Sequence, residues 1–144
     1  KISSRTINDF HPLKLAINIP EIIVHSSNIG SAMIAEKIGP DIQLTFLKNL
    51  GFFDSAKLEI PEISKPQIIT DKKRLSTMTI SYGHGISITL VHLATATASI
   101  INGGFKSNPS LIKNSSKNNI KQRIFSENTS LKMRSIMRLV VSNK

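Results

Sequence analysis

In most of the segments that are rich in apolar residues, these residues recur at the spacing of an α-helix. In residues 29–38, for example, Ile29, Met33, Ile34 and Ile38 follow a 3.6-residue repeat. The same reasoning predicts helices over residues 20–25, 29–38, 41–50, 89–101 and 126–141. Since each helix covers only roughly two to four turns, the pattern is typical of a packed globular core.

Residues that start or stop helices lie at the edges of these segments. Gly39-Pro40, Gly51 and Asn102-Gly103-Gly104 end apolar repeats, which agrees with the usual place of glycine just beyond a helix. Ser126 is suited to cap the last helix, and the acidic Glu127 follows it in the first turn, where the helix dipole favours negative charge.

The rest of the chain shows no sustained period. We interpret residues 52–70, 105–113 and 114–121 as an extended loop, a short extended segment and a polar loop, in that order. In residues 81–87 two glycines flank His84, which predicts a backbone in unusual angles or in close contact with another group. The expected fold class is therefore mostly α, with few short strands.

Length and composition agree with one globular unit. The chain has 144 residues, of which 40% are hydrophobic and 19% are charged, and its longest apolar stretch is too short to cross a bilayer. The formal net charge is +10, which makes a basic helical module that binds an acidic partner such as nucleic acid the alternative function. Against it, Lys and Arg are spread along the chain, with local groups at 72–74 and 113–123, and there is no Trp and one Tyr for stacking on bases.

The sequence predicts neither a metal site nor a cofactor. Cysteine is absent, and no pair of histidines lies one helical turn apart beside a carboxylate. The four histidines are His11, His25, His84 and His92. We expect His92 to be a core or edge residue of its apolar helix, and no glycine-rich phosphate loop is present.

Ser26-Ser27-Asn28 lies at the junction of two predicted helices. From these residues alone, a helix cap is the ordinary interpretation, because Ser and Asn are the residues that most often accept hydrogen bonds from free N–H groups. The functional alternative is a hydroxyl and an amide displayed at the start of a helix, where an anionic or carbonyl ligand is favoured.

The order of several segments resembles the class B penicillin-binding proteins, and most closely the division-type (septal) peptidoglycan transpeptidases. The segments are INDFHP (7–12), HSSNIG (25–30), LKNLGF (47–52), SYGHGISIT (81–89), LVHLATATASIINGG (90–104) and RIFSENTSLKMRSIMRLVV (123–141). The resemblance covers nearly the whole chain. It implies that residues 1–144 are a helical portion of an α/β serine β-lactamase/transpeptidase-like domain.

In that family a Ser-x-x-Lys nucleophile motif, a Ser-x-Asn motif and a Lys-Thr-Gly strand form the active site. The resemblance assigns the second motif to Ser26 and Asn28, with Ser27 as the spacer. It implies that the Ser26 hydroxyl helps relay a proton to the leaving amine. It also implies that the Asn28 side chain holds the substrate's amide and contacts the motif lysine.

The other two motifs are not found. The string Ser110-Leu111-Ile112-Lys113 has the nucleophile spacing, but it follows Pro109 in extended chain and comes after Ser-x-Asn, whereas the chemistry needs Ser and Lys one helical turn apart. Nothing matches Lys-Thr-Gly. We therefore expect a fragment between the first and third motifs, inactive by itself. One departure from the family is Phe53-Asp54-Ser55-Ala56-Lys57, where a glycine-rich stretch is usual.

The resemblance also implies partners and a location. Peptidoglycan stem peptides would be the substrate, and β-lactams would acylate the parent enzyme. In the parent we expect a membrane glycosyltransferase and other division proteins as partners. The resemblance places this domain in the periplasm of a protein anchored in the inner membrane, although no anchor or signal occurs in these residues.

Overall fold

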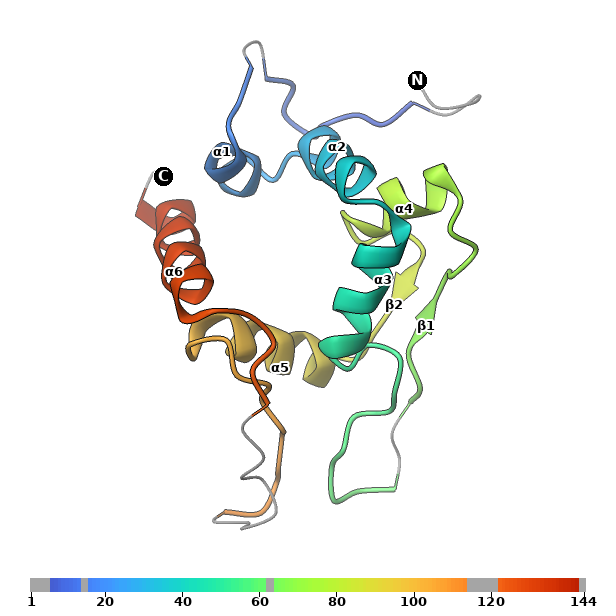
Figure 1. The fold of residues 1–144 in the computed structure, drawn as a ribbon, viewed down its shortest axis with the longest axis vertical. Coiled ribbons are helices and arrows are strands. Elements are labelled where there is room, and N and C mark those ends of the chain that lie inside the picture. Colours follow the sequence, from blue (N-terminus) through green and yellow to red (C-terminus); the bar gives the residue numbers. More distant parts are fainter. Residues whose placement is uncertain (1–5, 14–15, 62–63, 114–121, 143–144) are drawn as a thin grey trace. The chain divides into compact units, whose positions relative to one another are not determined.

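The computed structural model describes residues 6–13, 16–61, 64–113 and 122–142, and most of the regular structure in them is helical (Figure 1). The helices are α1 (Ile19–Val24), α2 (Asn28–Ile38), α3 (Pro40–Asn49), α4 (Arg74–Ile80), α5 (Leu90–Ile101) and α6 (Glu127–Ser142). The strands β1 (Gln67–Ile68) and β2 (Ile86–Ser87) form a two-stranded sheet. The prediction of a mostly α fold with few short strands is confirmed.

Helix boundaries differ from the predictions by only a residue or two. The exception is α4, for which no helix was predicted from sequence; its seven residues are too few to show a clear apolar repeat. The predicted loop 52–70 also contains β1. The predicted polar loop 114–121 lies outside the described residues. No described helix is both long enough and apolar enough to cross a membrane.

The chain divides into two compact units. Unit 1 comprises Lys1–Leu44, Ile69–Ile86 and Ser135–Lys144, and unit 2 comprises Thr45–Ile68 and Ser87–Arg134. Helices α3 and α6 therefore each begin in one unit and end in the other. The Ser-x-Asn motif belongs to unit 1.

Small residues on α2 hold the core of unit 1 together. Ala32 and Ala35 are buried about one helical turn apart, Gly30 is buried on a different face, and α2 packs against α4 and α1. A Cβ added to Gly30 would lie 2.6 Å from the Ile22 side chain of α1, so only glycine allows this approach.

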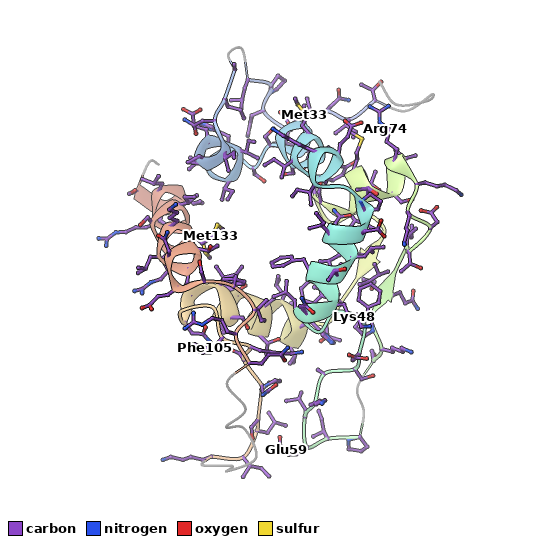
Figure 2. All side chains as sticks on the ribbon, viewed as in Figure 1. Met33, Lys48, Glu59, Arg74, Phe105 and Met133 are labelled. Atoms are coloured by element: carbon purple, nitrogen blue, oxygen red, sulfur yellow. The ribbon has the colours of Figure 1, made fainter. Side chains whose placement is uncertain are left out.

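Polar contacts join α2 and α3 to α4 within the same unit. Arg74, which is labelled in Figure 2, lies at the start of α4. It forms an ion pair with Glu36 of α2. The Gln43 side-chain amide donates a hydrogen bond of 3.0 Å to the Thr77 carbonyl. These contacts hold α2, and with it the Ser-x-Asn turn, on a rigid neighbour.

Unit 2 is organised around α5. Its buried His92 is 3% exposed and is held from both sides of the ring, by the Thr89 hydroxyl at 2.8 Å and the Asp54 carbonyl at 2.9 Å. Ser130 of α6 is also buried, where it donates to the Ile100 carbonyl and accepts from the Gly103 N–H. The prediction that His92 is a core residue is confirmed.

Candidate functional site

Helix α1 ends in a Schellman motif that contains the first residue of the triplet. The Ser27 N–H donates to the Ile22 carbonyl at 2.9 Å and the Ser26 N–H donates to the Ile23 carbonyl at 3.2 Å, which is the pair of bonds that defines this motif. Such a motif places one residue in the left-handed region. That residue is Ser26, with φ of 52°.

A serine in this position is unusual, because glycine is the residue that the left-handed conformation favours. Ser26 is exposed, and among the residues that the structure describes its hydroxyl has no hydrogen-bond partner. The two hydrogen bonds of the Schellman motif come from backbone N–H groups, so among the described residues the serine side chain forms no bond of its own to offset the cost of this conformation. Strain of this kind is concentrated at functional sites.

The sequence predicted a helix cap within the triplet 26–28, and the structure assigns that cap to Ser27. It is 2% exposed, its Oγ accepts the Gly30 N–H at 2.9 Å, and its hydroxyl donates to Asp9 Oδ2 at 3.0 Å. Both functions of the hydroxyl are therefore used inside the protein. This makes Ser27 more than a spacer, because it fixes the backbone between Ser26 and Asn28.

Asn28 is the first residue of α2, and its side chain is oriented by the upstream chain. Its Nδ2 donates to the Asn8 carbonyl at 3.0 Å. Within the part of the chain that the structure describes, the second amide hydrogen and the Oδ1 oxygen have no partner. An oriented amide can accept from one group and donate to another at once, which is what holding a substrate amide beside a lysine requires.

Asp9 is the residue of this site that sequence reasoning missed. Its Oδ1 accepts the Ile29 N–H at 2.9 Å, while its Oδ2 accepts the Ser27 hydroxyl. The signal was present in the segment INDFHP, but only the fold shows that this segment lies against the start of α2. The bonded residues are 18 to 20 positions apart in the sequence, so no local sequence pattern predicts these contacts.

The same Ser-x-Asn spacing recurs at Ser126-Glu127-Asn128, and its geometry differs. Ser126 is itself the cap of α6, since its Oγ accepts the Thr129 N–H at 3.1 Å and lies 2.9 Å from the Thr129 hydroxyl. Its hydroxyl is thus engaged, whereas that of Ser26 is exposed. A further match at 116–118 lies outside the described residues.

The rejected nucleophile string has no catalytic geometry. Residues 110–113 form bends and a turn, not a helix. The Ser110 hydroxyl donates to Glu59 Oε1 at 2.6 Å, so it is bonded to a carboxylate and not to the amine of Lys113. A carboxylate can accept a hydrogen bond from a serine hydroxyl, but the serine–lysine pair of a Ser-x-x-Lys nucleophile is not formed here.

The other histidines form no common site. His11, His25 and His84 are exposed. Across the described ranges, no group of three His, Cys, Asp or Glu residues is placed to hold a metal ion.

The basic triplet 72–74 is neutralised by carboxylates of its own unit. The pairs are Lys72 with Asp41, Lys73 with Asp71, and Arg74 with Glu36. Cations already paired in this way have less to gain from phosphate groups, so the strongest local cluster of positive charge speaks against the nucleic-acid alternative.

Two of these groups show the effect of the pairing on protonation. A hydrogen bond from Ser76, followed by one from the Lys73 backbone, lowers the pKa of Asp71 below its usual 3.8. The hydrogen bond to Glu36 raises the pKa of Arg74 above its usual value. Both shifts favour the charged forms.

Comparison with known families shows which class of protein has this fold and this Ser-x-Asn turn. The family model of the penicillin-binding protein transpeptidase domain matches residues 1–144. The chain therefore belongs to the penicillin-binding protein transpeptidase domain family.

Curated relatives point to one branch of this family. The chain is 36% identical over 144 residues to the probable peptidoglycan D,D-transpeptidase FtsI of Caulobacter vibrioides, with 96% of the chain and 24% of the relative covered. It is 26% identical over 138 residues to the peptidoglycan D,D-transpeptidase FtsI homolog of Mesostigma viride, with 88% and 23% covered. The chain thus spans about a quarter of the length of these relatives.

Solved structures share the fold. A crystal structure described as a peptidoglycan glycosyltransferase from Burkholderia ambifaria aligns with a TM-score of 0.86 at 24% identity, covering 94% of this chain and 43% of the other. The apo transpeptidase domain of Burkholderia pseudomallei penicillin-binding protein 3 aligns with a TM-score of 0.81 at 26% identity, covering 87% and 39%. The expected helical portion of an α/β transpeptidase-like domain is confirmed.

Proposed function

We propose that the chain supplies the Ser-x-Asn wall of the active site of a serine D,D-transpeptidase that cross-links peptidoglycan. In this reaction a serine outside the motif attacks a peptide carbonyl, an acyl-enzyme forms and an amine leaves. A second amine then takes the acyl group. Penicillin-binding enzymes are acylated by β-lactams at the same serine, so a β-lactam reports on the first half of the reaction.

The observation that carries this proposal is the exposed hydroxyl of Ser26, which has no hydrogen-bond partner within the described ranges and is held in the left-handed conformation. A hydroxyl that is free on the protein side can accept a proton from one group and pass its own to the leaving amine. The strain in the backbone is consistent with selection for this position and not for stability.

Asn28 complements Ser26. Its Nδ2 bond to Asn8 leaves Oδ1 and one hydrogen for the substrate's amide and for the motif lysine. Since Ser26 precedes the cap and Asn28 follows it, the two side chains are carried by a single rigid turn. Among the described residues no base contacts the Ser26 hydroxyl to activate it as a nucleophile, so we assign the attacking serine of the reaction to another segment.

Because the only Ser-x-x-Lys string, at 110–113, lacks helical geometry and no Lys-Thr-Gly string occurs, we propose that these 144 residues are part of a transpeptidase domain and are inactive alone. In the parent, the partners would be stem peptides, a membrane glycosyltransferase and other division proteins. An anchor in the inner membrane would place the domain in the periplasm.

The test compares labelling by a fluorescent penicillin. The 144-residue chain should remain unlabelled, whereas the complete protein that contains it should form a stable covalent adduct. Stable labelling of the chain alone would contradict the assignment of the nucleophile to another segment. Failure of the complete protein to label would contradict the proposed function itself.

A further inference from the structure

We infer that Asp9 is a positioning residue of the reaction, which holds Ser26 and Asn28 in their working geometry through Ser27 and the first turn of α2. The inference rests on the proposed function of the Ser-x-Asn motif. It adds a carboxylate that is no part of that motif and precedes it by a whole helix.

The first step of the argument is the hydrogen bonding at the start of α2. A helix begins with N–H groups that have no partner within the helix. Here Ile29 N–H is satisfied by Asp9 Oδ1 at 2.9 Å and Gly30 N–H by Ser27 Oγ at 2.9 Å. The carboxylate also lies at the positive end of the helix dipole, where a negative charge is stabilised.

The second step concerns Ser27. As a cap, its oxygen accepts from Gly30, but acceptance alone leaves the hydroxyl free to rotate about the Cβ–Oγ bond. The 3.0 Å bond to Asp9 Oδ2 fixes that rotation. Since Ser27 is 2% exposed, water does not substitute easily for the carboxylate if it is removed.

The third step connects Ser27 to its neighbours. The Ser27 backbone N–H closes the Schellman motif that keeps Ser26 in the left-handed region. The adjacent residue of the upstream segment, Asn8, orients the Asn28 amide through its carbonyl. Asn8 and Asp9 thus hold the chain on both sides of the Ser27 cap. We call these two residues the clamp.

Loss of the clamp would loosen the turn without unfolding α2, whose contacts with α4 are separate. Displacement of a catalytic group by about 1 Å is enough to reduce a rate about 100-fold. We therefore expect Asp9→Ala, in the complete protein, to lower the rate constant of acylation by a β-lactam by about 100-fold.

Asp9→Asn separates positioning from simple capping. Its remaining oxygen can still accept the Ile29 N–H, but its NH₂ group cannot accept the Ser27 hydroxyl. We expect an intermediate loss of about 10-fold, with the melting temperature of the complete protein little changed. A merely structural role predicts that activity and stability fall together and that the asparagine variant recovers both.

The matched control is Asp41→Ala. Asp41 is an exposed carboxylate of the same unit, in the first turn of α3, and its partner is Lys72 at 2.7 Å. It does not touch the Ser-x-Asn turn, so its removal should leave acylation unchanged. The side-chain amide resonances of Asn28 in the 144-residue chain should shift in Asp9→Ala and not in Asp41→Ala.

The outcomes are distinct. Acylation of a folded Asp9→Ala protein at the unsubstituted rate would overturn the inference while leaving the proposed function intact. Absence of acylation in the unsubstituted protein would overturn the proposed function first. If Asp9→Ala does not fold, Asp9→Asn decides: unchanged acylation overturns the inference, and slower acylation at an unchanged melting temperature supports it.

Discussion

Replacing Ser26 by glycine is expected to stabilise the chain and to abolish its contribution to catalysis. Ser26 has φ of 52°, a conformation that costs an L-residue about 1–2 kcal/mol. Glycine escapes this cost but loses about 0.5–1 kcal/mol more backbone entropy on folding. The difference is a gain of about 0.5–1 kcal/mol in the free energy of unfolding.

The hydroxyl itself adds little to this sum, because among the described residues it has no hydrogen-bond partner. Ser26→Ala keeps the strain and should change stability by less than about 0.5 kcal/mol. Ser31→Gly, inside α2, is the control with a helical backbone and should lose about 0.5–1 kcal/mol or more, because glycine has the lower helix propensity and the hydrogen bond from the Ser31 hydroxyl to the Ser27 carbonyl is also lost. The two glycine variants are therefore expected to differ in sign.

The assay is thermal and urea unfolding of the chain, followed by far-ultraviolet circular dichroism. A gain of this size corresponds to a rise in melting temperature of about 1–4 °C. A Ser26→Gly chain that is less stable than the unsubstituted one would refute the strain argument. In the complete protein, Ser26→Gly and Ser26→Ala should both slow transpeptidation by about 100-fold or more, and full turnover in either would refute the proton relay.

Four other expectations can be measured on the chain alone. Gly104→Ala should lower the free energy of unfolding by more than about 2 kcal/mol, and the melting temperature with it, because the new Cβ would lie 2.1 Å from the Phe125 carbonyl oxygen. An unchanged melting temperature would contradict this close approach. His92→Ala should cost about 3 kcal/mol in urea unfolding through the cavity and the unsatisfied Asp54 carbonyl, and a loss below about 1 kcal/mol would contradict its core role. The lowered pKa of Asp71 adds stability that is present above its usual pKa of 3.8 and is lost as the pH falls through the pKa of the folded state. Asp71→Asn should therefore reduce the drop in melting temperature between about pH 5 and about pH 3. An unreduced drop would show that other carboxylates dominate the acid unfolding. Because Lys and Arg are spread along the chain and the cations of 72–74 are paired with carboxylates, we expect at most weak binding to duplex DNA despite the net charge of +10. Tight binding that is lost steeply with rising salt would instead support the alternative function.

Local sequence signals predicted most of the helices and the cap. The repeat in 29–38, the stop at Gly39 and the capping residues around Ser27 act over one or two turns, and the structure places α2 and its cap there. The short helix α4 was missed, because seven residues carry too little periodicity and its stability comes from packing against α2.

In the candidate site, too, some features were predicted from the sequence and others were seen only in the structure. The order of segments singled out Ser26 and Asn28, and their catalytic role stays a proposal. Nothing in the order of residues indicated that Ser26 would occupy a left-handed conformation, because glycine is the usual residue there. Nor did it indicate Asp9, which reaches the motif only after the intervening chain has turned back.

The sequence by itself therefore determined every described helix except α4, a cap within the triplet 26–28, and membership of a transpeptidase family through its segment order. Only the tertiary structure decided which hydroxyl of the triplet is buried and which is exposed, and which carboxylate holds the turn. The physical reason is range: caps and apolar repeats depend on neighbours within a few residues, whereas the exposure of Ser26 and the reach of Asp9 depend on how segments far apart in the chain pack against one another.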